Sequence, residues 1–279
     1  MEMQNSLFAE SSFEDTDCRL FSTRRERPIL QPDDIDFEMQ FSKRNDKLLI
    51  KSISQEGFEH FLLNYGDTYK VLYLSDCSKI FDLSPLASLS NLEALAIDYN
   101  KKSDRLWDFF SNTNLKVLSI MDSKKLIENP LHLQTSGSLE EIRLWSSGLE
   151  HPHTLRSMEC FRGMKSLKRI VLNNIKLSDK NMDVLATLPG LEEFHFDPGM
   201  LTTEEIARIC AKYPHLHGYS LRAYDDTHIR AGEVRVCGYR KPTLYLPKQQ
   251  ELLNKYILQF KKLVAQFKTE NHNYTGEKI

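Results

Sequence analysis

Apolar and polar residues follow a nine-residue pattern that recurs seven times between Tyr69 and Tyr224. The first, fourth and sixth positions of each copy are apolar, and residues 92–100 (LEALAIDYN) are the clearest example. The copies begin at residues 69, 92, 115, 139, 167, 191 and 216, so successive starts are 23 to 28 residues apart. The pattern predicts one short strand per copy, with positions four and six buried, followed by a return segment.

The repeat length indicates how these copies are arranged. A single strand with its return segment cannot bury its apolar face alone, so neighbouring copies have to stack and share one core. Over about residues 45–224 the chain resembles leucine-rich repeat proteins, in particular the cytoplasmic bacterial ones. The resemblance implies an α/β solenoid shaped as a horseshoe, with a parallel β-sheet on the concave side and helices or turns on the convex side. It also implies a role in protein recognition.

The residues before the repeats are expected to form a flexible arm and a cap. Residues 1–32 are polar and charged without sustained periodicity, which predicts the arm. Residues 33–68 predict the N-terminal cap, because a solenoid has to cover the apolar end of its stack. Within this cap we expect an edge strand over residues 35–41, a second strand over residues 47–53 and a helix over residues 54–65.

A second cap is expected after the seven repeats, which occupy residues 69–224. Residues 225–268 begin with an alternating stretch that predicts an eighth strand, able to pair with the last repeat. Residues 247–268 carry apolar side chains at steps of three and four, the pattern of an amphipathic helix. This helix is expected to fold over the last core layer, and the alternative is an exposed helix that docks into a partner's groove. Residues 269–279 are expected to be a disordered tail.

The return segments are expected to lengthen along the chain. Residues 83–89 suit a single tight turn, whereas residues 178–188 and 202–212 predict helices with N-terminal caps. In the second of these helices, the first threonine and the glutamate three positions later can form a capping box. The insertion that lengthens the fourth repeat predicts a further helix over about residues 152–162.

Charge and composition narrow the classes of function. The 37 Lys and Arg nearly balance the 39 Asp and Glu, so no global field favours nucleic acid or an acidic membrane. The apolar runs are at most four residues long, and the first residues are acidic where a signal peptide is basic. Five scattered cysteines without a CxxC motif favour reduced thiols. We therefore expect a cytoplasmic monomer with neither a nucleic-acid nor a membrane partner.

The candidate binding surface follows from strand alternation, which should direct positions three, five and seven out of the concave sheet. Trp145 is prominent there, because Trp, Tyr and Arg dominate binding hot spots. Arg143, Arg169 and Met121 should surround it on the same face. The alternative is a Trp145 that is covered by a loop or stacked under an arginine and only closes the sheet. The predicted partner-binding residues are Trp145, Arg143, Arg169, Met121, Tyr73, Tyr99, Asp98, Asn173, Glu193, His195, Asp197 and Arg222.

One strand carries a row that could support chemistry, namely Glu193, His195 and Asp197. Carboxylates around an imidazole can bind a metal or act as acid and base. Side chains two positions apart on a flat strand are expected to diverge, so we prefer a polar recognition patch. Two His-x-His pairs lack a second ligand pair at zinc spacing. The sequence contains no GxGxxG, GxxxxGK[ST], GxSxG or HExxH motif, so we predict a non-catalytic protein without cofactor or metal.

The preferred interpretation is a non-catalytic scaffold that binds a protein partner through the concave sheet, with Trp145, Arg143 and Arg169 as central anchors. A bacterial immunity or inhibitor-type protein that neutralises a toxin or enzyme is the alternative within the same class. An enzyme or accessory module that uses the acid–histidine–acid row is the alternative from another class. A purely structural assembly protein is a third possibility.

Overall fold

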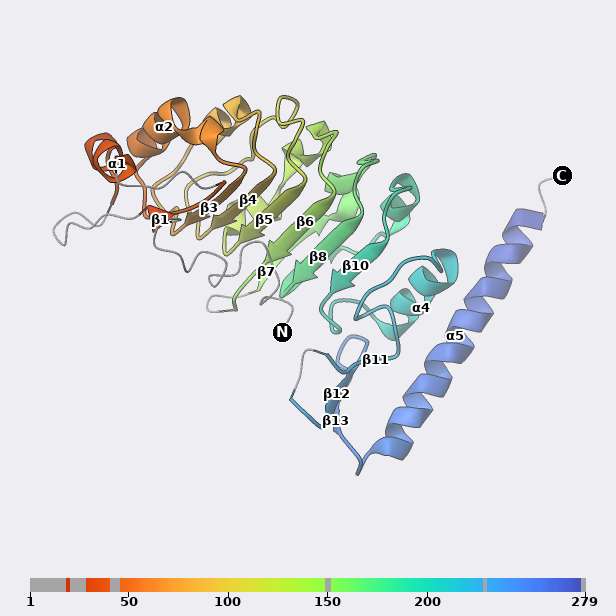
Figure 1. Ribbon diagram of the computed structural model, residues 1–279. Coiled ribbons are helices and arrows are strands. Elements are labelled where there is room, and N and C mark those ends of the chain that lie inside the picture. The colour runs from red at the N-terminus through yellow and green to blue at the C-terminus, as the bar shows by residue number, and fades with distance from the viewer. Residues whose placement is uncertain (1–18, 21–28, 41–45, 149–151, 228–229, 277–279) are drawn as a thin grey trace.

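The central feature of the computed structural model is a sheet of eight parallel strands (Figure 1). The structure describes residues 19–20, 29–40, 46–148, 152–227 and 230–276. In spatial order the strands are Arg19–Leu20 (β1), Lys47–Lys51 (β2), Val71–Ser75 (β3), Ala94–Asp98 (β4), Val117–Met121 (β5), Glu141–Trp145 (β6), Arg169–Asn173 (β8) and Glu193–Phe196 (β10).

Six of the seven predicted repeat strands are present and lie in exact repeat register. Leu72 pairs with Leu95, and Leu95 pairs with Leu118, so position four of each copy lies opposite position four of the next. Positions four and six are completely buried in all six strands. The pattern therefore correctly predicted both the strands and their buried faces, and the chain has a leucine-rich-repeat-like α/β fold.

The return segments cover one face of this sheet, and a single apolar cluster fills the space between them (Figure 1). The predicted helix over residues 54–65 is confirmed as α2, with Ser54 accepting a hydrogen bond from the backbone of Gly57. The predicted turn over residues 83–89 and the capping box that begins α4 are confirmed as well. The return elements are Gln55–Asn64 (α2), Gly66–Thr68 (η4), Ser84–Ser88 (η5), Lys124–Glu128 (α3), Leu131–Thr135 (η6), Met158–Phe161 (η7), Asp183–Thr187 (η8) and Thr203–Lys212 (α4).

Two of the predicted return helices are wrong. Residues 152–162 and 178–188 instead contribute to a small parallel sheet of His153–Ser157 (β7) and Ile175–Asp179 (β9), followed by the short segments η7 and η8. Leu155 lies opposite Leu177, and both side chains are buried while their neighbours along each strand are less so. This period of two suits a strand better than a helix.

The predicted edge strand over residues 35–41 is also wrong, because Pro32–Met39 forms helix α1. Proline suits the first turn of a helix, and the Asp34 carboxylate accepts a hydrogen bond from the backbone of Gln31 at 3.1 Å. Ile35 is buried whereas Phe37 is half exposed, so the alternation does not describe one buried face. Phe41 lies outside the described residues.

The predicted flexible arm, residues 1–32, lies mostly outside the described residues. Its described part is attached to the sheet. β1 pairs with β2, and Leu30, which is fully buried, donates its backbone N–H to Ser52 O at 2.8 Å.

The seventh predicted strand does not form. Its described backbone pairing with β10 is one bridge between His217 and Glu193. Gly218 then approaches β10 so closely that a Cβ atom there would lie 2.0 Å from the carbonyl oxygen of Phe194. The chain turns at this point, and the Ser220 hydroxyl donates a hydrogen bond to the carbonyl of Phe196. The turn therefore occupies the position next to β10 where a further repeat strand would have to pair.

The C-terminal part forms a separate antiparallel sheet, in which the predicted eighth strand pairs with the end of the seventh copy, with Val236 opposite Tyr224, and not with the repeat sheet. Its strands are Tyr224–Asp225 (β11), Glu233–Val236 (β12) and Thr243–Tyr245 (β13). Gln250–Gly276 (α5) follows and runs along α4 (Figure 1). The helix continues beyond residue 268 into the predicted tail, of which residues 277–279 lie outside the described part.

Helix α5 packs against α4 through both apolar and charged groups. Phe260 and Phe267 are buried, and the guanidinium carbon of Arg208 lies 3.9 Å from the centroid of the Phe267 ring. Arg208 also pairs with Glu270 at 3.7 Å. No helix within the described ranges is both long and apolar enough to cross a lipid bilayer.

Candidate functional site

Positions three, five and seven of the repeats form the sheet face opposite the return segments, here called the open face. At β2 to β4 the centre of this face is apolar and buried. Tyr73 packs there with Leu49, Val71, Ala94 and Ala96, and it is only 5% exposed. The prediction that Tyr73 is available to a partner is therefore wrong, because its ring contributes to a second, smaller apolar cluster.

Farther along the sheet, at β5 to β8, the open face becomes partly exposed. Trp145 lies directly opposite Met121 on one side and Asn173 on the other, as the repeat register predicts. All three side chains are partly exposed. Trp145 is thus neither fully covered nor isolated, and its role in binding stays a prediction.

The charged side chains of this region form one connected network across three strands. Glu141, Arg169 and Glu193 lie opposite one another in register. Arg169 Nε lies 3.2 Å from a Glu193 carboxylate oxygen and 3.9 Å from one of Glu141. Glu141 in turn accepts a hydrogen bond from Arg143. Both arginines are therefore held in place by carboxylates on the same face.

His195 extends this network but is less accessible than predicted. Its Nε2 lies 2.7 Å from Glu193 Oε2, its ring centroid lies 5.1 Å from that of Tyr219, and the residue is 8% exposed. The hydrogen bond from His195 lowers the pKa of Glu193, and the positive charge of Arg169 adds to this effect. The expectation that side chains two positions apart would diverge is wrong here, because both lean toward one another.

Asp197, the third member of the predicted row, does not contact Glu193 and His195 in this way. The carboxylate of Asp197 accepts a hydrogen bond from the backbone N–H of Asn174 on the neighbouring repeat. Within the described ranges, no group of three or more His, Cys, Asp or Glu side chains is arranged to hold a metal ion.

The carboxyl ends of β3, β4 and β5 form an acidic edge of the open face, made of Asp76, Asp98 and Asp122. The pKa of Asp98 is raised to about 6, mainly by burial and then by the negative charges of Asp122 and Asp76, against a lowering hydrogen bond from Tyr73. Asp76 and Asp122 have positive φ angles of 51° and 44°, a conformation that Asp and Asn tolerate better than most residues. The turn after each of these two strands thus favours Asp or Asn, and the Asp residues found there supply the negative charge.

Two further predicted residues lie at the margins of the face. Tyr99 follows β4 and is 37% exposed, and Lys101 Nζ lies 4.1 Å from the centroid of its ring. Arg222 lies outside the sheet because the seventh strand is absent, and it pairs at 3.0 Å with both Asp225 and Asp226. Its prediction as a residue of the binding face is therefore wrong.

Sequence reasoning left two relevant residues out of the site. Glu141 is absent from the predicted partner-binding residues although it occupies position three beside Arg169, and cross-strand neighbours of opposite charge commonly pair. Asp122 is also absent from the predicted partner-binding residues, although it directly follows Met121, which lies opposite Trp145. Both could have been found by comparing equivalent positions of adjacent copies.

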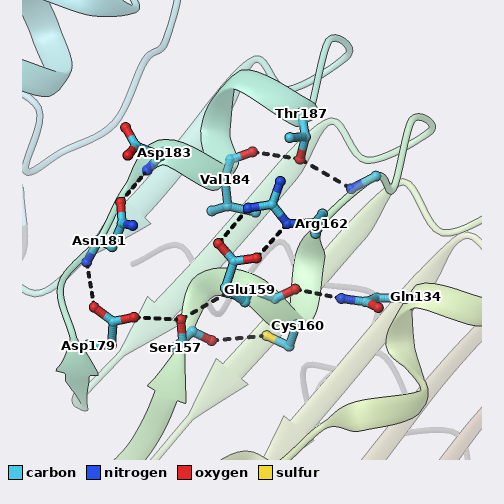
Figure 2. A network of polar contacts seen from close by, with 11 residues as sticks. Gln134, Ser157, Glu159, Cys160, Arg162, Asp179, Asn181, Asp183, Val184 and Thr187 are labelled. Carbon is cyan, nitrogen blue, oxygen red and sulfur yellow. Dashed lines mark hydrogen bonds and ion pairs between the residues drawn. The ribbon is translucent and has the colours of Figure 1, made fainter.

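A second polar network lies on the return side, around β7 and β9 (Figure 2). Ser157 Oγ donates to Asp179 at 3.2 Å, and Arg162 makes two hydrogen bonds to Glu159 that lower the pKa of that carboxyl. Asp179 in turn accepts from the backbone N–H of Asn181 at 3.0 Å. These contacts tie consecutive turns together, so we assign the network to stabilisation of the return side.

The four described cysteines are free thiols. Burial raises the pKa of Cys77, and it raises the pKa of Cys160 and Cys237 to about 12 and that of Cys210 to about 11. Because the thiolate is the nucleophile, these cysteines have the properties of structural rather than catalytic residues.

No protein-family model matches the chain, and no curated protein is detectably similar to it. Among solved structures, the chain is similar to internalin C2 from Listeria monocytogenes str. 4b F2365, at 22% identity and a TM-score of 0.39 over 54% of this chain and 60% of the internalin. It is also similar to the internalin inlF of the same strain, at 18% identity and a TM-score of 0.42 over 68% of this chain and 50% of the other. The matched part thus spans only half to three fifths of those internalins, and the repeat architecture rests on the strand register described above.

Proposed function

We propose that this chain is a non-catalytic protein-binding module whose partner docks on the open face around Trp145. The observation that carries the proposal is a partly exposed Trp145 in register with Met121, in the middle of a continuous sheet. Trp is the residue type most enriched among hot spots, where a ring fills a desolvated pocket of the partner. Further sheet strands flank this pair on both sides, so the surface extends beyond the ring.

The surroundings of Trp145 support a preorganised surface. Arg143 and Arg169 are already held by Glu141 and Glu193, so a partner would lose little free energy in ordering them. Strands also position side chains more rigidly than loops do. The central anchors of the interface are then Trp145 with the two arginines beside it.

Several observations favour binding over catalysis. His195 is buried, and Asp197 is engaged elsewhere, so the acid–histidine–acid row does not converge on a substrate. The near-zero net charge of −2 favours a protein partner over nucleic acid or an acidic lipid surface. We further infer a horseshoe-shaped cytoplasmic monomer without cofactor, whose stack is capped by α2 at one end and α5 at the other.

The test is affinity purification from the native cell with the wild-type chain, Trp145→Ala and Leu131→Ala as baits. Leu131 is a matched apolar control, 63% exposed on the return side. We expect Trp145→Ala to weaken a purified partner by about 2 kcal/mol, roughly 30-fold in Kd. The control should bind as the wild type does. Unchanged affinity of a folded Trp145→Ala variant would contradict the proposal.

The identity of the partner then separates a scaffold from an inhibitor. If the partner is a toxin or an enzyme, its activity is measured with and without the bound chain. Loss of that activity on binding, relieved by Trp145→Ala, would assign the chain to immunity or inhibitor-type proteins.

A further inference from the structure

Four side chains at the carboxyl ends of β4, β5 and β6 form a continuous strip, here called the acidic–aromatic strip. Met121 lies opposite Asp98 on one side and opposite Trp145 on the other. Asp122 donates its backbone N–H to Trp145 O at 3.0 Å, and its carboxylate accepts from the backbone N–H of Ser147 at 2.8 Å. Since adjacent strands are about 4.8 Å apart, the strip places two carboxylates beside a thioether and an indole.

Within the described ranges, the carboxylates of this strip lack the arginine partners that some other acids of the open face have. Glu141 and Glu193 both pair with arginine. In the part of the chain that the structure describes, neither Asp98 nor Asp122 forms an ion pair with a lysine or arginine. Asp98 has a long hydrogen bond of 3.5 Å from Tyr73, and Asp122 lies 3.8 Å from His153 Nε2.

The energetic consequence of this arrangement is visible at Asp98. The pKa of this carboxyl is raised to about 6 by burial and then by the negative charges of Asp122 and Asp76. Like charges held close together destabilise the ionised form, and a cation placed between them would relieve that repulsion. The strip is thus electrostatically complementary to a positive group.

The apolar half of the strip favours the same kind of ligand. A guanidinium or ammonium group is attracted to the face of an indole ring, and its methylene stem can pack on apolar atoms. The chain itself shows this chemistry at the next position, where Lys101 Nζ lies over the ring of Tyr99.

We propose that the protein partner presents a cationic segment to this strip, with an arginine or lysine head group between Asp98 and Asp122 and its stem on Met121 and Trp145. The proposal rests on the proposed function and adds the chemistry of the partner. A second copy of this chain is the main competing occupant, because the exposed lysines of α5, such as Lys255 and Lys262, could supply the cation.

The first experiment measures binding of the peptide acetyl-Ser-Arg-Ser-Arg-Ser-Arg-amide by calorimetry and by tryptophan fluorescence. Trp107 is 3% exposed, so a fluorescence change reports mainly on Trp145. We expect saturable binding that is at least tenfold weaker for the uncharged citrulline analogue. The double variant Asp98→Asn/Asp122→Asn should also bind the arginine peptide at least tenfold more weakly than the wild type does.

The matched control is Asp104→Asn/Glu192→Gln, which removes two exposed carboxylates away from the strip and changes the net charge equally. It should bind within twofold of the wild type. Any of three results would overturn the proposal. They are an equal loss of peptide affinity in this control, equal affinity for the citrulline peptide, and no saturable binding of the arginine peptide. Thermal unfolding of each variant establishes that it is folded.

The second experiment uses the partner identified under the proposed function. If Trp145→Ala weakens this partner and Asp98→Asn/Asp122→Asn does not, the open face binds by other chemistry and only the present inference fails. If neither variant weakens it, the proposed function fails as well. Sedimentation that shows a dimer, abolished by Asp98→Asn/Asp122→Asn, would assign the strip to a second copy and overturn the inference of a partner segment.

Discussion

Arg169 on β8 lies directly opposite Glu193 on β10, and its Nε approaches the Glu193 carboxylate to 3.2 Å. The same guanidinium lies 3.9 Å from Glu141, so it is the cation between two acids. We expect Arg169→Gln to lower the free energy of unfolding by about 1 kcal/mol at low salt and by less at high salt, since the site is partly exposed. Chemical denaturation at two salt concentrations measures this change.

The control for that prediction is Lys212→Gln, which removes an exposed ion pair with Asp183 at 3.1 Å. Exposed pairs contribute little, so its effect should stay below about 0.5 kcal/mol. Equal effects of the two substitutions would show that the network adds nothing beyond a single surface ion pair.

The lowered pKa of Glu193 predicts that the stability of the protein depends on pH in the acid range. The pKa of Glu193 is lowered in the folded protein, first by the hydrogen bond from His195. The stability that it contributes is therefore present above the unfolded pKa, near 4.5, and is lost as the pH falls through the lower folded value. Unfolding curves between pH 3 and 6 should show a smaller loss of stability on acidification for Glu193→Gln than for the wild type. An identical loss would contradict the prediction.

Asp98 predicts the opposite dependence of stability on pH, because its pKa is raised from 3.8 to about 6. The folded state binds this proton more tightly than the unfolded state, so the associated stability declines as the pH rises from about 4 to about 6. Asp98→Asn should remove that decline and stabilise the protein at pH 7 by about 1 kcal/mol, less than a fully buried group would give. Asp104→Asn, at an exposed position, should leave the curve unchanged.

A stabilising Asp98→Asn would also bear on the proposed cation site. A residue that lowers stability while strengthening binding is typical of a functional surface. Stability and peptide affinity should then change in opposite directions in this variant. If both increase, Asp98 does not contribute to binding a cation.

Gly218 predicts a large local effect on stability. A Cβ atom at this position would lie 2.0 Å from the carbonyl oxygen of Phe194, so the backbone of the turn or of β10 would have to move. We expect Gly218→Ala to lower the free energy of unfolding by about 2 kcal/mol or more. Gly137→Ala is the matched control, because no atom lies within 4 Å of its Cβ position. Thermal unfolding of both variants measures the difference.

Prediction from the sequence succeeded where one periodicity was repeated many times. Leu95 and Ile97 occupy the same positions as their counterparts in the other copies, and every such position on the six observed strands is buried. Prediction failed where a short pattern was read alone. The alternation at residues 35–41 and the capping signal at Ser178 each suit two local structures. A proline and the Asp34 cap begin helix α1, whereas pairing with β7 places Leu177 in strand β9.

The residues of the candidate site were likewise predictable from the sequence only in part. Met121 and Trp145 are neighbours because equivalent positions of adjacent copies must pair, and this follows from the repeat. The burial of Tyr73 and the contact of His195 with Glu193 depend on side-chain packing and rotamers, which a strand pattern does not specify.

The sequence by itself therefore determined the parallel sheet, its register and the row in which Trp145 lies, because these depend on a regular spacing of apolar residues. Only the tertiary structure decided where the stack ends and which of the described carboxylates pair with an arginine. The end depends on the close approach of Gly218 to β10, and the charge balance depends on which side chains reach one another across strands. Both are properties of distance in space, which sequence spacing leaves open.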